Sequence, residues 1–172
     1  MDITDQILDD HHRQRRMFAQ LDELGRDDIE HLTAVWDRLA TFLEVHAEAE
    51  EELLYPRLLE VGKGAADADD AEEETEDAIR DHNDIRQAIR RARQHDVGTV
   101  EWRRAVADAR RANSDHMAEE ERQALSDFRR QTDIAERHAL GASFAAFEGK
   151  HFRGVDSSDE DPDEYVSEMG RT

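Results

Sequence analysis

The sequence HAEAEE at residues 46–51 returns as HMAEEE at residues 116–121, and the dipeptide DH at residues 10–11 returns at residues 81–82. The shift is 70 residues from 46 to 116 and 71 residues from 11 to 82, so the chain contains an internal near-duplication. Each copy joins an early histidine to a later histidine that is followed by a glutamate four residues on. The duplication predicts two similar helical hairpins related by a pseudo-twofold axis.

Apolar residues recur at helical spacing around these motifs, in stretches that cover residues 3–24, 29–54, 79–89 and 102–128. Gly25 ends the first stretch, the next helix is expected to open near Asp27 or Asp28, and Pro56 predicts a kink. Two Pro, eight Gly and no alternating runs of β-branched residues leave little material for a sheet. We therefore predict an all-α fold, an up-down-up-down antiparallel four-helix bundle.

Outside the long helices, the sequence predicts a loop, a short helix and a tail. Residues 62–74 are small, acidic and interrupted by two glycines, which predicts a solvated connection. Residues 134–147 are expected to form a short C-terminal helix. We predict one bundle domain over residues 1–150, followed by an acidic, flexible tail over residues 151–172.

The composition is strongly acidic, with 44 Asp and Glu residues against 23 Lys and Arg and a formal net charge of -21. Nucleic acid and anionic membranes are not expected as partners, because both attract positive surfaces. Lysine occurs only at Lys63 and Lys150, and a surface rich in acids and poor in lysine resembles proteins of salt-accumulating halophiles. The chain has no cysteine, no apolar signal region and no membrane-length apolar run, so we expect a cytoplasmic protein.

Four histidines are expected near one level of the bundle. At 1.5 Å per residue, the path from His11 to the first turn is roughly 20 Å and the path back to His46 roughly 27 Å. The paths from His82 to the second turn and back to His116 have nearly the same lengths. Each histidine also shares a helix face with apolar residues, so all four are predicted to point into the core.

Two glutamates complete the predicted site. Glu50 and Glu120 follow His46 and His116 by four residues, so each pair lies on one helix face, a single turn apart. A carboxylate in a bundle core is costly unless it is paired or bound to a metal. Imidazole and carboxylate together suit iron, zinc or manganese, here with two nitrogens per ion and both carboxylates as bridges. The predicted metal ligands are His11, His46, Glu50, His82, His116 and Glu120.

His12 is an alternative to His11 as a ligand. His11 is preferred because it shares a stripe with Ile7 and Phe18 and matches His82 in the duplication. The other histidines lack this pattern and are interpreted as helix-end or surface residues, namely His31, His95, His138 and His151.

With these motifs, the chain resembles the haemerythrin-like, or HHE cation-binding, domain. The resemblance covers about residues 1 to 130, and its most specific part is HAEAEEELLYP at residues 46–56. It implies a four-helix bundle with an oxo- or hydroxo-bridged centre of two iron ions. Three departures stand out: Arg86 replaces the fifth histidine of the oxygen carriers, Ser126 replaces an expected proline, and the chain lacks the cysteines of the repair proteins.

The resemblance leaves three functions open. The leading hypothesis is a protein that binds or senses O2, NO or peroxide, or iron status. The alternative is a di-iron enzyme of peroxide removal or of nitrosative or oxidative damage repair, which rests on resemblance alone. A metal-free structural bundle is the third, and the sequence predicts no particular protein partner.

Overall fold

The structure is a computed structural model that describes residues 1–66 and 68–170. These residues form eight α-helices and no strand, which confirms the all-α prediction. The helices are α1 (Ile3–Glu23), α2 (Ile29–Leu53), α3 (Tyr55–Val61), α4 (Ala71–Arg93), α5 (Val100–Arg122), α6 (Ala124–Gln131), α7 (Ile134–Lys150) and α8 (Pro162–Met169). Within the same residues, no helix combines the length and the hydropathy that crossing a bilayer requires.

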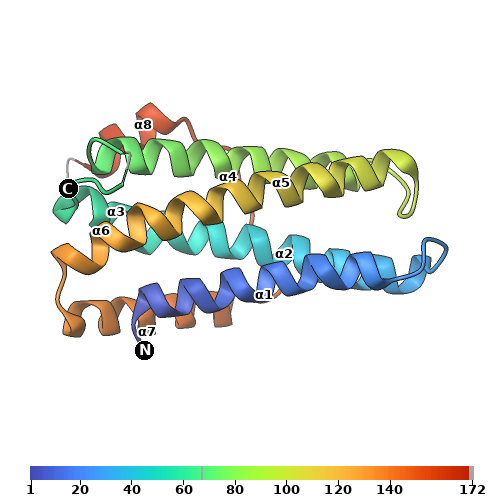
Figure 1. Cartoon of the computed structure of the whole chain (residues 1–172), viewed down its shortest axis with the longest axis horizontal. Coiled ribbons are helices and arrows are strands. Elements are labelled where there is room, and N and C mark those ends of the chain that lie inside the picture. Colours follow the sequence, from blue (N-terminus) through green and yellow to red (C-terminus); the bar gives the residue numbers. More distant parts are fainter. Residues whose placement is uncertain (67, 171–172) are drawn as a thin grey trace.

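The four long helices α1, α2, α4 and α5 lie along the long axis of the molecule (Figure 1). The α1–α2 turn and the α4–α5 turn are at the same end, and the shorter helices α3 and α6 are at the other. Each hairpin therefore runs out and back, with α1 packed on α2 and α4 packed on α5.

Polar side chains cap the starts of all four long helices, as α2 and α5 illustrate. Asp28 accepts a hydrogen bond from the backbone N–H of His31 at the start of α2. Thr99 accepts one from the backbone N–H of Trp102 at 3.2 Å at the start of α5. Such caps satisfy N–H groups that the first turn of a helix leaves without partners, which fixes where the helix begins.

Both hairpins break shortly after the duplicated motif. Helix α2 ends at Leu53, and α3 begins at Tyr55 with Pro56 in its first turn, so the predicted kink is present. Helix α5 ends at Arg122, and α6 begins at Ala124 although it contains no proline. The break is therefore common to both copies of the duplication, and Pro56 only favours it in the first.

Two apolar clusters fill the bundle, one toward each end. The turn-end cluster contains Trp36 and Trp102, whose rings meet edge to face with their centroids 6.0 Å apart. The second cluster lies where the short helices pack on the long ones, and its largest members include Tyr55, Phe128 and Phe144. Because the clusters are separate, the layer between them is available for polar groups.

The duplicated histidines occupy that layer. On α2, His46 follows Leu43 of the turn-end cluster and precedes Ala49 of the second cluster. On α4, which runs the other way, His82 lies between the two clusters in the reverse order. The helical spacing of the apolar residues thus places the histidines between two dry regions of the core.

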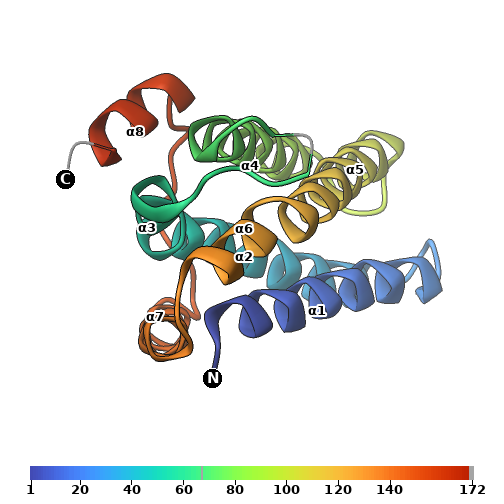
Figure 2. The same ribbon diagram turned by 60° about the vertical axis from the view of Figure 1, so that its left-hand side comes forward.

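The C-terminal residues differ from the expected flexible tail. The short helix predicted over residues 134–147 is α7, which packs on α1 and α2. The predicted tail contains a further helix, α8, which packs on α4 (Figure 2). The hydroxyl of Tyr165 donates to the backbone oxygen of Glu51, and Asn83 and Glu160 exchange two hydrogen bonds. Tyr165 and Val166 join the second apolar cluster, so this acidic segment is held on the bundle by a few apolar side chains.

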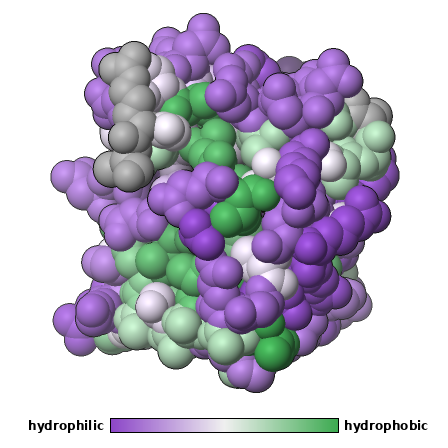
Figure 3. Space-filling model, turned by 90° about the vertical axis from the view of Figure 1, so that its left-hand side faces the viewer, coloured by the Kyte–Doolittle hydropathy of each residue, from purple (hydrophilic) through white to green (hydrophobic). Residues whose placement is uncertain are grey.

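The surface agrees with the acidic composition. Seen from the end that holds α3 and α8, it is mostly hydrophilic, with hydrophobic residues visible between the polar ones (Figure 3). Charged residues make up 39% of the chain, which is why hydrophilic groups dominate this face.

Candidate metal centre

The six residues predicted as ligands come from all four long helices. Helices α1 and α4 each contribute one histidine, whereas α2 and α5 each contribute a histidine and a glutamate one turn later. None of the six is more than 3% exposed. They are His11 on α1, His46 and Glu50 on α2, His82 on α4, and His116 and Glu120 on α5.

Glu50 lies among three of the histidines. Its Oε1 atom is 2.9 Å from Nε2 of His46. Its Oε2 atom is 3.3 Å from Nε2 of His82 and 3.9 Å from Nε2 of His116. Since the Nε2 atoms of His82 and His116 are themselves 3.2 Å apart, the two hairpins meet at this point.

Glu120 closes the cluster on the α1 side. Its Oε2 atom lies 3.3 Å from Nε2 of His11. Ligand-type atoms of His11, Glu50, His116 and Glu120, one from each residue, lie within 4.8 Å of one another. The structure thus brings all six side chains to one level, as their spacing along the chain predicts.

Several of these atoms are buried and have no hydrogen-bond partner in the described part of the chain. They are Nε2 of His11 and His46, both carboxylate oxygens of Glu50, and Oε2 of Glu120. A buried polar atom without a partner costs about 1–3 kcal/mol, so such atoms are rarely left together. Imidazole nitrogens and carboxylate oxygens that converge in this way suit a dication. The residues present therefore fit a metal site.

The remaining histidines lie outside this cluster. His12 is exposed, whereas His11 is fully buried, so only His11 reaches the other ligand candidates. The others are exposed or lie at the end of a helix, as expected: His31, His95, His138 and His151.

Residues 2–127 match the hemerythrin HHE cation binding domain. The chain belongs to this family. No curated protein and no solved structure matches the chain. An HHE domain implies a bound metal cation, commonly iron, and the His and Glu cluster supplies suitable ligands. The match spans the four long helices and ends within α6, so α7 and α8 lie beyond the HHE domain.

In this HHE domain, two histidines are held from outside by a second pair of glutamates. Nδ1 of His82 lies 2.7 Å from Oε1 of Glu51, and Nδ1 of His11 lies 3.0 Å from Oε1 of Glu121. Each of these glutamates directly follows a candidate ligand, Glu50 or Glu120. A carboxylate on Nδ1 fixes the orientation and the tautomer of an imidazole, which keeps Nε2 pointing inward.

Two aspartates face the other histidines. Oδ2 of Asp10 is 3.8 Å from Nδ1 of His46, and Oδ2 of Asp81 is 3.7 Å from Nδ1 of His116. These distances exceed those of a hydrogen bond, so the aspartates act mainly through their charge. The ligand prediction did not include any of these supporting carboxylates. The signal was available, because the DH dipeptides and the paired glutamates recur in both copies.

An arginine supports each of the outer glutamates, four residues after the histidine of the DH dipeptide. Arg86 donates to Oε2 of Glu51 at 2.7 Å, and Arg15 donates to Oε1 of Glu121 at 2.7 Å. Arg86 occupies the place of the fifth histidine of the oxygen carriers. Its guanidinium binds Glu51, which in turn holds His82, so it supports a candidate ligand from outside.

The two glutamates among the candidate ligands, Glu50 and Glu120, have different neighbours. The hydroxyl of Tyr55 donates to Oε1 of Glu120 at 2.8 Å. The equivalent position in the other copy is Leu125, which has no hydroxyl to offer Glu50. Burial and the charge of Glu120 raise the pKa of Tyr55, so its hydroxyl remains a donor.

The carboxylates of the cluster raise the pKa of two of the histidines beside them. Burial lowers the pKa of His11, but the neighbouring carboxylates of Glu120 and Glu121 outweigh burial and raise the pKa to about 9. The pKa of His82 is raised to about 9 in the same way, by the neighbouring carboxylates of Glu50 and Glu51. Protonated imidazoles thus neutralise carboxylates that a bound dication can neutralise in their place.

A second group of ligand-type side chains lies behind His46. Asp10, His46 and Glu148 each offer an atom within 4.8 Å of the others. Burial raises the pKa of Glu148 to about 7, and Gln6 donates to its carboxylate at 3.3 Å. Glu148 is not among the predicted ligands, because only the packing of α7 on α1 and α2 brings it here.

Proposed function

We propose that this HHE protein is a non-haem di-iron protein whose up-down-up-down bundle binds or senses O2, NO, peroxide or iron status. The four imidazoles and the two glutamate carboxylates would hold the iron ions. Zinc and manganese are the other ions that such donors accept. The proposed ligands are His11, His46, Glu50, His82, His116 and Glu120.

The convergence of buried atoms that lack hydrogen bonds within the described chain carries this proposal. The arrangement is oriented, because the outer nitrogens of His11 and His82 already have carboxylate partners. A solvated helix face with the same residue types would satisfy its polar atoms with water instead. The family match supports a cation at this place.

Bound iron supplies the redox chemistry and the affinity for small ligands. The chain holds the imidazoles with their Nε2 atoms inward, through Glu51 and Glu121. It also keeps bulk water away, because the two apolar clusters lie on either side of the histidine layer.

Metal analysis of protein purified from an iron-replete host tests the proposal, and two iron ions per chain are expected. His46→Ala and His116→Ala each remove one ligand and are expected to lower the iron content sharply. The surface changes His31→Ala and His138→Ala are the matched controls and leave it unchanged. Wild-type protein that holds one metal ion or fewer contradicts the proposal.

An enzyme of peroxide removal or of nitrosative or oxidative damage repair is the alternative for the same centre. A steady-state assay with peroxide or NO separates the two functions: sustained turnover favours the enzyme, and a single stoichiometric reaction favours binding or sensing.

The acidic, cysteine-free composition supports a cytoplasmic location, which fractionation of the host cell can test.

A further inference from the structure

The layer next to the histidines, on the side of the turn-end cluster, differs between the two copies. Ile85 lies three residues after His82, and Leu43 lies three residues before His46. Both are buried members of the turn-end cluster. The equivalent residues on α1 and α5 are Gln14 and Asn113, which are 0% and 2% exposed. An apolar pair between α2 and α4 is thus matched by a buried amide pair between α1 and α5.

The amide pair leaves one donor free. Asn113 donates through Nδ2 to Oε1 of Gln14 at 3.0 Å, and the same nitrogen lies 3.6 Å from the sulfur of Met117. Nε2 of Gln14 is buried and has no acceptor within residues 1–66 and 68–170. The hydrogen bond from Asn113 to Gln14 is enough to fix how α1 and α5 pair. It leaves the N–H groups of Gln14 without an acceptor, and a buried donor without an acceptor is costly.

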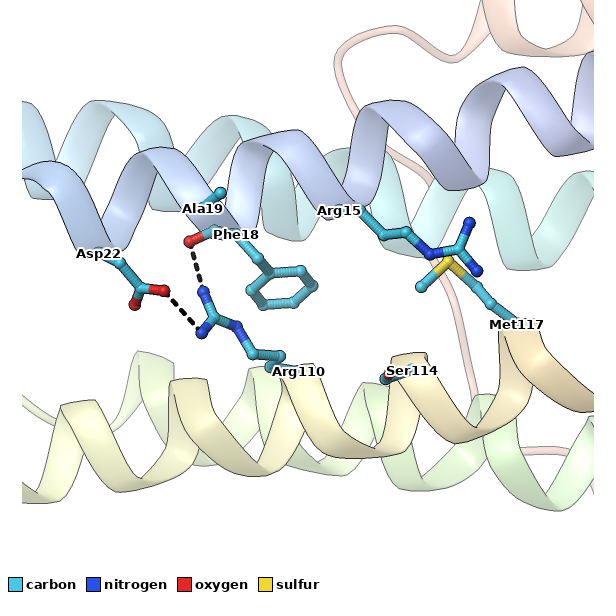
Figure 4. A pocket seen from close by; sticks show the side chains of 7 residues that line it. All are labelled: Arg15, Phe18, Ala19, Asp22, Arg110, Ser114 and Met117. Atoms are coloured by element: carbon cyan, nitrogen blue, oxygen red, sulfur yellow. Dashed lines mark hydrogen bonds and ion pairs between the residues drawn. The ribbon is translucent and has the colours of Figure 1, made fainter.

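A groove lies on the surface of the same α1–α5 side. It has a volume of about 280 Å³ and lies between α1 and α5, with Phe18 and Met117 among its walls (Figure 4). Arg110 lies at one end, bound to Asp22, and Arg15 lies at the other. Met117 directly follows a candidate ligand in the sequence, and Phe18 lies one turn beyond Gln14 on α1.

We propose that the α1–α5 side is the ligand side of the centre, and that Gln14 donates a hydrogen bond to the small molecule bound there. The inference rests on the proposed function. Gln14 is one turn from His11, and both side chains lie on the buried face of α1. The ligand class is a small anion or polar diatomic molecule with a lone-pair acceptor.

Azide binding to the iron-loaded protein tests this, followed by absorbance and by the infrared stretch of bound azide. Gln14→Met removes the donor at similar volume and is expected to raise the azide Kd about tenfold and to shift the infrared band. Ile85→Met makes the matching change in the other copy and is expected to alter neither. The double variant Gln14→Leu with Asn113→Leu rebuilds the apolar pair of the other copy, so it folds even if Gln14→Met does not, and it is expected to behave like Gln14→Met.

The possible outcomes separate this inference from the proposed function. Iron content is measured first, and a wild-type protein without iron overturns both. Two iron ions per chain, with azide binding unchanged in the Gln14 variants, overturn only the role of Gln14, as does a wild type that does not bind azide. Equal losses in Gln14→Met and Ile85→Met also overturn it, because packing would then explain both.

Discussion

We call the α2–α4 and α1–α5 contacts the two seams of the bundle. In each seam an arginine and a glutamate support a histidine, but only in the α2–α4 seam are they sealed from solvent. Between α2 and α4, the side chains of Arg86 and Glu51 are 1% and 6% exposed. Between α1 and α5, those of Arg15 and Glu121 are 40% and 30% exposed. Equivalent positions in a duplicated sequence therefore have very different surroundings.

The cover over the α2–α4 seam comes from outside the duplication. Asn83 and Arg90 both bond to the segment that leads into α8, at Glu160 and Asp159 respectively. Arg86 lies between them on α4, so the same segment covers it. Helix α7 packs on α1 and α2 instead, and the groove of Figure 4 remains on the α1–α5 side. The duplication supplies the ligands, and the added C-terminal residues make the two sides unequal.

Metal removal is expected to have the largest effect and to act mainly on the α1–α5 seam. A ligand at a thousand times its Kd stabilises a fold by about 4 kcal/mol, which corresponds to roughly 10 °C in Tm for a chain of this size. We expect chelation to lower Tm by about that amount. Amide hydrogen exchange is expected to accelerate more on α1 and α5 than on α2 and α4, because the α2–α4 seam is also held by Arg86 and α8.

Calorimetry and exchange mass spectrometry on the same samples, with metal loss confirmed, measure both effects. A Tm that does not change on chelation contradicts the proposed centre. Equal acceleration on all four helices leaves the centre intact but contradicts the difference between the seams.

An effect of similar size is expected from Arg86→Met, compared with Arg15→Met. Removing Arg86 leaves Glu51 as a buried carboxylate without its cation, and breaking a buried pair costs about 3–5 kcal/mol. Removing Arg15 breaks a pair that water reaches, so we expect less than about 1 kcal/mol. Urea unfolding of the two variants measures the difference. Similar losses contradict the claim that only the α2–α4 seam is sealed.

Glu74→Gln is expected to have a smaller effect, and one that depends on pH. Glu74 lies in the first turn of α4 and is 2% exposed, while the equivalent residue of α1 is the apolar Ile3. Burial raises the pKa of Glu74 to about 7, from an ordinary value of 4.5. Between these values the unfolded chain releases the proton first, so the free energy of unfolding falls as pH rises.

The cost of Glu74 is therefore present at pH 8 and largely absent at pH 5. It amounts to at most about 3.5 kcal/mol, since a difference of one in pKa corresponds to about 1.4 kcal/mol. We expect Glu74→Gln to be more stable than wild type in urea unfolding at pH 8 and nearly equal at pH 5. Glu72→Gln, on the exposed face of the same turn, is the control. A gain of the same size at both pH values contradicts the assignment.

The helices and the ligand cluster were predictable because both follow from short-range spacing. Apolar periodicity places His46 and His82 in the core, and the duplication brings the two hairpins to one level. The position of Glu148 beside His46 depends on how α7 packs, and the burial of Arg86 depends on a segment about 70 residues further along the chain. No local pattern carries such contacts, so Arg15 and Arg86 look alike in the sequence.

The smallest expected effect is the response of the Arg15 pair to salt. The Debye length falls from about 10 Å at 0.1 M to about 3 Å at 1 M, so we expect the cost of Arg15→Met to vanish in molar chloride. The cost of Arg86→Met persists, because water and ions do not reach the buried pair. Wild-type Tm is expected to rise in the same series, since a net charge of -21 repels itself at low salt. Urea and thermal unfolding in KCl measure all three, and chloride avoids the extra hydrophobic stabilisation that sulfate adds. A wild-type Tm that does not change with KCl concentration contradicts the halophile hypothesis. If the cost of Arg86→Met falls with salt as steeply as that of Arg15→Met, the α2–α4 seam is open to ions.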